Sequence, residues 1–485
     1  MNLCLIGHNF RYELEKLLRI FMPFEKIEFF ETEVLGECYA VTEISGNTAK
    51  AKVSLFGETR ESETELEDGS EKDKELKLAL SLYNCLTSLS GYIPQWGILT
   101  GVRPAKLYSR LISSNGLEKA EDWFKNTLMV SDKKIKLCRE TLKGEGEITS
   151  LSKPDSFSLY ISVPFCPSRC SYCSFVSHSV EQAKKLIPQY VEQLCEEITV
   201  TGKIARQLKL RLETVYIGGG TPTTLSAEQL TQVMNTVKEN FDLSCLREYT
   251  VEAGRPDTVT AEKLTAIKNG GATRISINPQ TMNDEVLKTI GRRHTAEQTV
   301  EAFKMARSLG FNNINMDLIA GLPTDTFESF KDTVNEIIEL DPESVTVHSL
   351  SMKRSATLNT TGQLPEIEVG KIADKMVDFA YSTLSQNGIV PYYMYRQSKT
   401  VGNLENVGYA KKGYECLYNV YIMDETHTIL ACGASAVTKL KEPQGPYIER
   451  IFNFKYPYEY ISRFGEILSR KDGINNFYEK FKEEL

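Results

Sequence analysis

The central third of the chain alternates between short apolar runs and amphipathic stretches with helical spacing. Two of these stretches begin with capping boxes, Ser226 with Gln229 and Thr295 with Gln298. The apolar runs have the length of strands, and we expect strands at 159–163, 214–217, 248–252, 274–278, 314–319 and 344–350. Six consecutive βα units predict a parallel sheet, and therefore an α/β fold class.

The N-terminal residues follow a different pattern. Short β-like runs at 26–30 and 49–55, separated by glycine turns, indicate a small α+β module. The acidic, polar run 58–74 is expected to form a solvated loop or linker. Helical patterning follows at 75–89 and 117–142, and these two stretches are separated by a loop containing glycine and proline.

After about residue 350 the alternation ends in a region rich in Tyr and Gly. We therefore expect three parts: an N-terminal α+β module with a helical extension, 1–150, the βα units, 151–350, and a C-terminal α+β domain, 351–485. Tyrosines at 392, 393, 395, 409, 414, 418 and 421 fall in the last part. Such side chains either form core or cover a flat ligand.

Composition and charge exclude several classes of protein. The chain has 57 Lys and Arg against 65 Asp and Glu, a net charge of -8, which argues against a general nucleic-acid coat. With 31 Gly and 17 Pro it is neither collagen-like nor a disordered tail. No stretch approaches 18 consecutive apolar residues, and charges interrupt the first twenty. We expect no membrane span and a cytoplasmic location.

Three of the 11 cysteines fall within eight residues, in the order Cys166, Cys170 and Cys173. Closely spaced thiolates suit an iron–sulfur cluster, and a four-iron cubane held by three cysteines leaves one iron open for a non-protein ligand. A structural zinc site needs a fourth ligand, which His178 is close enough in sequence to supply. The spacing favours the cluster, because zinc pairs usually come as C-x2-C with a distant second pair.

At these residues the sequence resembles the radical S-adenosylmethionine (SAM) superfamily, with Tyr172 at the aromatic position of its cysteine motif. Three longer segments resemble the oxygen-independent coproporphyrinogen III oxidase family, most closely its coproporphyrinogen dehydrogenase HemZ subfamily; they are Tyr160–Cys166, Gly218–Thr223 and Asp317–Pro323. The resemblance covers about residues 155–350. It implies a partial (β/α)6 barrel that binds a [4Fe-4S] cluster through the three cysteines, together with SAM.

The resemblance also implies the residues that contact SAM. Most of them follow the carboxyl ends of the expected strands, which meet at one mouth in parallel βα barrels. Glycines let the backbone approach a ligand, carboxylates accept hydrogen bonds from an ammonium or hydroxyls, and Arg pairs with a carboxylate. The implied contacts are Tyr160, Tyr172, Gly219, Gly220, Thr221, Glu252, Gln280, Arg292 and Asp317.

In the resembling enzymes a reduced cluster cleaves SAM to a 5′-deoxyadenosyl radical, which abstracts a hydrogen from a propionate of coproporphyrinogen III. Loss of CO2 and an electron leaves a vinyl group, and the product is protoporphyrinogen IX. The implied partners are a tetrapyrrole substrate and a reduced flavodoxin or ferredoxin-type electron donor, without nucleic acid. A substrate with four carboxylates needs a basic patch, for which the candidates are Arg103, Lys106, Lys353, Arg354 and Arg396.

One departure from the family pattern follows Cys173. The family's decarboxylases continue with Gly-Cys-Asn, whereas this chain continues with Ser174, Phe175 and Val176, as haem chaperones of the family do. The alternative function is haem delivery without decarboxylation, and a third possibility is radical chemistry on another tetrapyrrole. Haem delivery predicts binding that depends on a cysteine or on one of His8, His178, His294, His348 and His427.

Overall fold

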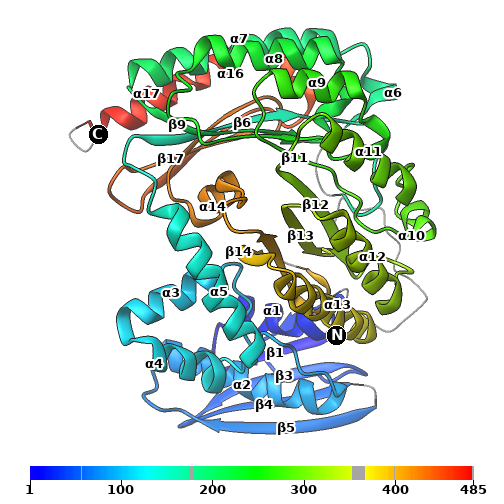
Figure 1. Cartoon of the computed structure of the whole chain (residues 1–485). Coiled ribbons are helices and arrows are strands. Elements are labelled where there is room, and N and C mark those ends of the chain that lie inside the picture. The colour runs from blue at the N-terminus through cyan, green and yellow to red at the C-terminus, as the bar shows by residue number, and fades with distance from the viewer. Residues whose placement is uncertain (24, 56, 174–177, 352–365, 398, 483–485) are drawn as a thin grey trace.

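The computed structural model describes residues 1–485 except 24, 56, 174–177, 352–365, 398 and 483–485 (Figure 1). Its largest element is an eleven-stranded sheet in the order β14-β15-β13-β12-β11-β10-β9-β6-β16-β17-β18. Six central strands run parallel, namely β6 (Ser156–Val163), β9 (Arg211–Gly219), β10 (Glu248–Glu252), β11 (Arg274–Ser276), β12 (Ile314–Ala320) and β13 (Ser344–Ser349). The prediction of six parallel βα units is confirmed.

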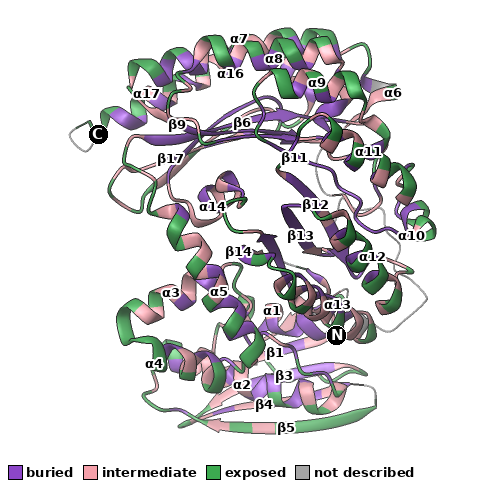
Figure 2. Ribbon diagram, in the orientation of Figure 1, coloured by how far each residue is buried: buried purple, intermediate pink, exposed green. Residues whose placement is uncertain are grey.

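Helices cover the convex side of this sheet, and Figure 2 shows their exposed outer faces against buried strands. Both predicted capping boxes are present, at Ser226 and Thr295. The covering helices are α7 (Ile187–Gln207), α8 (Ala227–Asn240), α9 (Ala261–Asn269), α10 (Asp284–Thr289), α11 (Ala296–Ser308) and α12 (Phe327–Leu340). A two-stranded ribbon, a helical turn and two 3-10 turns complete the region: β7 (Phe165–Cys166), β8 (His178–Ser179), α6 (Val180–Ala183), Pro222–Thr224 and Pro256–Thr258.

The C-terminal residues extend the same sheet at both edges. β14 (Val390–Arg396) and β15 (Glu405–Ala410) lie beyond β13, and β16 (Thr428–Cys432), β17 (Val437–Lys441) and β18 (Ile448–Phe452) lie beyond β6. The division at residue 350 therefore stays a prediction about folding units, since the sheet crosses it. The helices of this part are α13 (Glu366–Gln386), α14 (Leu417–Asp424), α15 (Pro457–Ser462), α16 (Phe464–Arg470) and α17 (Asp472–Glu479), with a 3-10 turn at Val401–Asn403.

The N-terminal part contains a separate five-stranded sheet in the order β2-β1-β3-β4-β5. Its elements are β1 (Asn2–Ile6), α1 (Arg11–Phe21), β2 (Glu28–Phe30), β3 (Tyr39–Ser45), β4 (Thr48–Leu55), β5 (Glu58–Glu65) and α2 (Glu71–Ser90). A helical extension connects it to β6 through α3 (Pro104–Asn115), α4 (Leu117–Asp122), a π-helical turn at Trp123–Thr127 and α5 (Asp132–Thr149). In the described part of the chain, no helix is long and apolar enough to cross a membrane.

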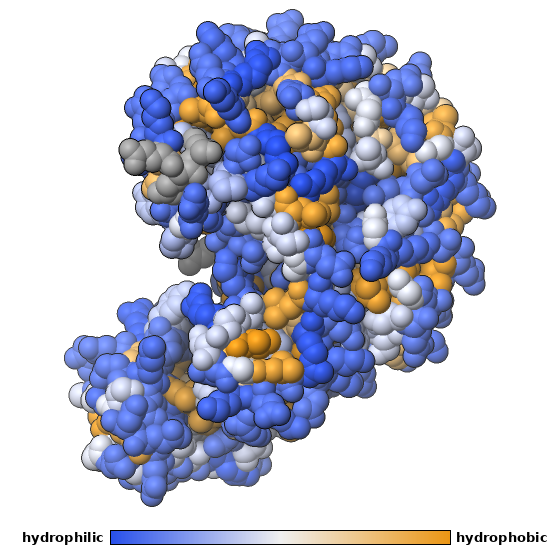
Figure 3. All heavy atoms as spheres, turned by 60° about the vertical axis from the view of Figure 1, so that its left-hand side comes forward, coloured by the Kyte–Doolittle hydropathy of each residue, from blue (hydrophilic) through white to orange (hydrophobic). Residues whose placement is uncertain are grey.

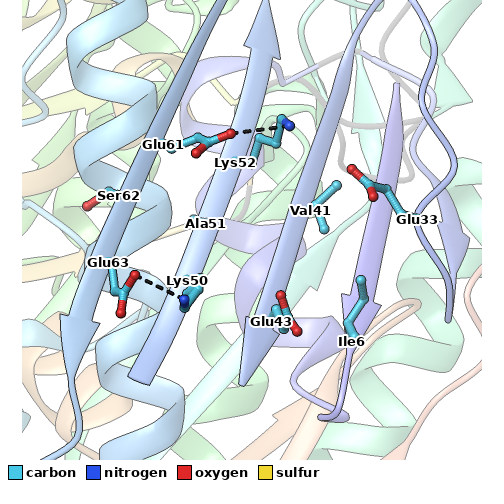
Figure 4. A pocket seen from close by; sticks show the side chains of 10 residues that line it. All are labelled: Ile6, Glu33, Val41, Glu43, Lys50, Ala51, Lys52, Glu61, Ser62 and Glu63. Atoms are coloured by element: carbon cyan, nitrogen blue, oxygen red, sulfur yellow. Dashed lines mark ion pairs between the residues drawn. The ribbon is translucent and has the colours of Figure 1, made fainter. Parts of the chain in front are cut away.

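The prediction of a solvated linker over 58–74 is wrong. Residues 58–65 form the edge strand β5, which pairs with β4 in antiparallel register, and α2 begins at Glu71. Two ion pairs join β4 to β5, from Lys50 to Glu63 at 3.1 Å and from Lys52 to Glu61 at 3.2 Å. These four side chains line an open groove on the five-stranded sheet (Figure 4). A charged edge strand protects a sheet from pairing with other chains, so the charges do not exclude a strand.

The helical pattern predicted over 117–142 is interrupted. Met129 adopts a positive φ of 59°, and the hydroxyl of Ser131 accepts a hydrogen bond from the backbone N–H of Lys134 at 3.4 Å. This N-cap starts α5 as a new helix. The extension therefore changes direction before it reaches the large sheet.

Candidate functional site

The cysteine loop begins at the carboxyl end of β6. Cys170 is buried, whereas Cys166 and Cys173 are half-buried. The backbone N–H of Ser171 donates to the carbonyl of Ile290 at 3.1 Å, which fastens the loop to the end of α10. The loop is thus fixed in place while two of its thiols stay partly accessible.

Arg255 is a neighbour of this loop that the sequence reasoning missed. It is only 3% exposed, and its guanidinium donates to the hydroxyl of Ser168 at 2.9 Å and lies 4.0 Å from the sulfur of Cys170. The other edge of the Arg255 guanidinium pairs with the carboxylate of Asp257 at 2.7 Å. Arg255 therefore places a buried positive charge beside the sulfur of Cys170. The signal was available in the sequence, since the Arg255–Asp257 segment begins three residues after the last residue of β10.

The glycine-rich end of β9 lies against the same loop. The N–H of Gly220 donates to Val163 O, and the N–H of Thr221 donates to Phe165 O, both at 2.8 Å. A Cβ at Gly220 would lie 2.6 Å from Phe165 O, so only glycine permits this approach. The hydroxyl of Thr221 reaches the sulfur of Cys166 at 3.5 Å.

Glu252 lies at the end of the next strand, β10. Tyr216 Oη donates to its carboxylate at 2.6 Å. Burial raises the pKa of Glu252 to about 7, although this hydrogen bond and one from the Gly219 N–H lower it. The ring of Tyr160 lies 6.3 Å from that of Tyr216 in a stacked arrangement. Tyr160 and Glu252 are therefore joined through Tyr216.

Gln280 and Asp317 come together across the neighbouring strands. The N–H of Gln280 donates to Asp317 O at 2.9 Å, and Gln280 is buried with a φ of 70°. Such a backbone conformation in a non-glycine residue is strained and occurs frequently at functional sites. Burial alone would raise the pKa of Asp317, but hydrogen bonds from His348, Asn315 and Thr346 bring it below its ordinary value.

Arg292 contacts the cysteine loop through Tyr172. Its Nη2 and Nε donate to Tyr172 Oη at 3.0 and 3.3 Å, and its Nη1 donates to Gly254 O at 3.4 Å. The structure thus brings Thr221 and Arg292 to the loop and joins Gln280 to Asp317. No direct contact joins Gln280 or Asp317 to the loop among the hydrogen bonds of the described residues.

The candidates for a basic patch are engaged with other partners. Arg103 pairs with Glu425 at 2.6 Å, and Lys106 donates to the carbonyl of Asp424 at 2.9 Å. Arg396 is buried and donates to Leu99 O at 2.7 Å. These three residues therefore do not form a free patch. Lys353 and Arg354 lie outside the described residues, as do Ser174, Phe175 and Val176.

The tyrosines of the C-terminal part mainly form core. Tyr395 is half-buried and Tyr414 is 38% exposed, whereas the remaining five of the seven are buried, namely Tyr392, Tyr393, Tyr409, Tyr418 and Tyr421. Packing is therefore the role that the structure gives to most of them.

The residues present fit a [4Fe-4S] cluster and SAM. Three soft thiol donors share one fixed loop, a buried guanidinium lies beside one of them, and a glycine backbone approaches them closely. Within the described ranges, no three His, Cys, Asp or Glu side chains converge around a point for a single metal ion. The assignment to a cluster therefore rests on the donor chemistry and on the motif.

Comparisons with known proteins identify the family. Residues 160–337 match the Radical SAM superfamily. The chain is 37% identical to the oxygen-independent coproporphyrinogen-III oxidase-like protein HemZ of Bacillus subtilis, covering 83% of this chain and 82% of the relative. It is 33% identical to the heme chaperone HemW of Lactococcus lactis, over 59% and 70% of the two chains. Superposition of this structure on that of the Escherichia coli coproporphyrinogen III oxidase HemN gives a TM-score of 0.48. The two chains are 21% identical in sequence, and the match covers 66% of this chain and 71% of HemN. The chain belongs to the oxygen-independent coproporphyrinogen-III oxidase-like family of the radical SAM superfamily.

Proposed function

We propose that this chain is an oxidoreductase that converts coproporphyrinogen III to protoporphyrinogen IX by oxidative decarboxylation of propionates to vinyl groups. The observation that carries the proposal is the 37% identity to a coproporphyrinogen-III oxidase-like protein over 83% of the chain. The contact of the cysteine loop with the glycine-rich end of β9 supports it.

When bound, the cluster and SAM together supply one-electron chemistry that removes a hydrogen atom from the substrate. The chain's own residues hold and orient both groups. Cys166, Cys170 and Cys173 supply the thiolates, and Arg255 offsets negative charge beside Cys170. Glu252 in its ionised form accepts hydrogen bonds from an ammonium group, and Gly220 lets the end of β9 lie against the backbone of the cysteine loop.

The tetrapyrrole substrate and a reduced flavodoxin or ferredoxin-type donor complete the proposed reaction. We place it in the cytoplasm, where glutathione and thioredoxin keep thiols reduced. Cysteines outside the loop, such as Cys85, Cys138 and Cys432, form no disulfide, which agrees with such a compartment. The net charge of -8 argues against nucleic acid as a partner.

An anaerobic assay tests the proposal. The reconstituted protein is incubated with reductant, SAM and coproporphyrinogen III, and vinyl product and 5′-deoxyadenosine are measured together. We expect both products from the wild type and neither from Cys170→Ala. SAM cleavage without any vinyl product would refute the decarboxylase assignment.

Haem delivery is the second candidate, and the position of His178 favours it. This half-buried histidine pairs with Phe165 beside the cysteine loop, and the rings of Tyr456 and Tyr458 each lie 6.1 Å from its own. In contrast, both ring nitrogens of the buried His427 already contact serine hydroxyls at 2.8 Å. Stoichiometric haem binding that is lost in His178→Ala and kept in His427→Asn would support delivery, whereas equal haem binding by both variants would oppose it.

A further inference from the structure

Helix α14 lies inside the concave side of the large sheet (Figure 1). Six of its eight residues are apolar or aromatic and lie on all sides of the helix, namely Leu417, Tyr418, Val420, Tyr421, Ile422 and Met423. Tyr418, Val420 and Tyr421 are buried, whereas Leu417, Ile422 and Met423 are half-buried. Its surroundings include the rings of Tyr160 and Tyr216, which adjoin the candidate SAM site.

Tyr418 makes the contact with that site. Its ring stacks on Tyr216, with centroids 4.5 Å apart and planes at 26°, and on Tyr160, with centroids 6.0 Å apart and planes at 15°. Tyr216 in turn donates to Glu252 at 2.6 Å. The orientation of Glu252 therefore depends on a ring that belongs to α14.

The first turn of α14 is fixed by Glu248 of β10. The buried carboxylate accepts from the N–H of Leu417 at 2.7 Å, from the N–H of Tyr418 at 3.5 Å and from the thiol of Cys416 at 3.3 Å. A carboxylate at a helix N-terminus stabilises the helix through its free N–H groups and its dipole. The strand that carries Glu252 thus also holds the start of α14.

The other end of α14 is held from the N-terminal part. Glu425, which directly follows the helix, pairs with Arg103 beside α3 at 2.6 Å and with Arg450 of β18 at 3.3 Å. Lys106 of α3 donates to the carbonyl of Asp424 at 2.9 Å. Figure 3 shows a hollow between the smaller and the larger lobe of the molecule. The charged side chains of Arg103, Glu425 and Arg450 join elements from both lobes.

We propose that the α3 region positions α14, and that Tyr418 is thereby a positioning residue for the SAM site. This inference rests on the proposed function. It gives the N-terminal 150 residues a role in SAM binding, because the Arg103–Glu425 pair holds the helix that carries Tyr418. Glu425 also pairs with Arg450 of β18, so the two ion pairs together connect the N-terminal part to the edge strand at one end of the large sheet.

Four variants of the full chain with its cluster test this role: Tyr418→Leu, Tyr418→Phe, Arg103→Gln and the double variant Arg103→Gln/Tyr418→Leu. The readouts are the SAM dissociation constant, measured calorimetrically without reductant, and bound iron. Because an aromatic pair contributes about 0.5–1.5 kcal/mol, Tyr418→Leu is expected to weaken SAM binding about two- to thirteenfold, and Tyr418→Phe to retain wild-type affinity. Arg103→Gln is expected to weaken binding about twofold, because a partly exposed pair contributes less.

The matched control is Arg463→Gln, which removes an exposed ion pair with Glu466 at 2.7 Å on α16. It should leave SAM affinity and iron unchanged. In the double variant the two losses should not add, since both act through α14. Unchanged SAM affinity in Arg103→Gln, or equal loss in Tyr418→Leu and Tyr418→Phe, would overturn the inference. Failure of the wild type to bind SAM would instead refute the proposed function.

Discussion

The hydroxyl of Tyr216 donates a hydrogen bond to the carboxylate of Glu252 at 2.6 Å, across the neighbouring strands β9 and β10. Both residues face the concave side of the sheet, where Tyr418 covers Tyr216. Burial raises the pKa of Glu252 to about 7 and thereby makes its ionisation sensitive to neutral pH.

The raised pKa of Glu252 predicts a pH-dependent stability. The folded state holds its proton up to a pKa of about 7, whereas the unfolded state releases it near 4.5. Between these values the folded chain binds more protons, so stability falls as pH rises and levels off above the folded pKa. Burial also raises the pKa of Glu145 to about 8 and that of Asp374 to about 6, so these groups add to the fall. Thermal unfolding of the cofactor-free protein should therefore show a smaller fall in Glu252→Gln than in the wild type.

The variant Tyr216→Phe provides a second test of the raised pKa of Glu252. The Tyr216 hydrogen bond lowers the pKa of Glu252, so its removal should extend the fall in stability to higher pH. Identical pH profiles for the wild type and Glu252→Gln would show that Glu252 titrates normally in the folded chain.

The cysteine loop predicts selective loss of iron. Replacing Cys166, Cys170 or Cys173 by Ala should each abolish binding of the cluster, because three thiolates are required to hold it. Cys245→Ala is the matched control, since Cys245 is a half-buried thiol outside the loop. Bound iron and visible absorption after anaerobic reconstitution provide the measurement. Retention of a full iron complement by Cys170→Ala would contradict the assignment.

Gly220→Ala should disturb the site through the backbone. The added Cβ would lie 2.6 Å from Phe165 O and 2.9 Å from Phe165 N, which forces the end of β9 away from the cysteine loop. We expect a loss of about 1–3 kcal/mol in unfolding free energy, together with weaker SAM binding. In the control variant Gly146→Ala in α5, the added Cβ would meet no atom within 4 Å. This substitution should leave the unfolding free energy unchanged or raise it by up to about 1 kcal/mol. Equal unfolding free energies for the two variants would disprove the close approach.

The C-terminal helices are fastened to the barrel by a buried ion pair. Lys471 lies 2.8 Å from Glu197 of α7, and both residues are buried. Lys471→Met leaves the carboxylate of Glu197 without its cation, which costs about 3–5 kcal/mol. Lys480→Met removes only an exposed pair with Glu449 at 3.2 Å and should cost less than about 1 kcal/mol. Urea denaturation of both variants measures the difference, and similar midpoints would refute it.

Local patterns in the sequence were sufficient for the parallel core and for the cysteine loop. Buried parallel strands require apolar runs, and helix starts require capping residues, so both kinds of signal are contained in a few consecutive residues. The same reasoning failed over 58–74, because charges on an edge strand resemble charges in a linker. The direct contacts of Thr221 with Cys166 and of Arg292 with Tyr172 agree with the expected grouping, while the roles of these residues in SAM binding stay predictions.

The sequence by itself determined the six βα units, the spacing of three thiols and the order of the motifs along the chain. Only the tertiary structure decided that Arg255 lies beside Cys170, that Arg103 pairs with Glu425, and that α14 lies within the concave sheet. The Arg103–Glu425 pair joins residues separated by 322 positions, and its formation depends on how strands at both edges of the sheet are placed. Local propensity carries no information about such contacts, because their energy appears only once distant segments have packed.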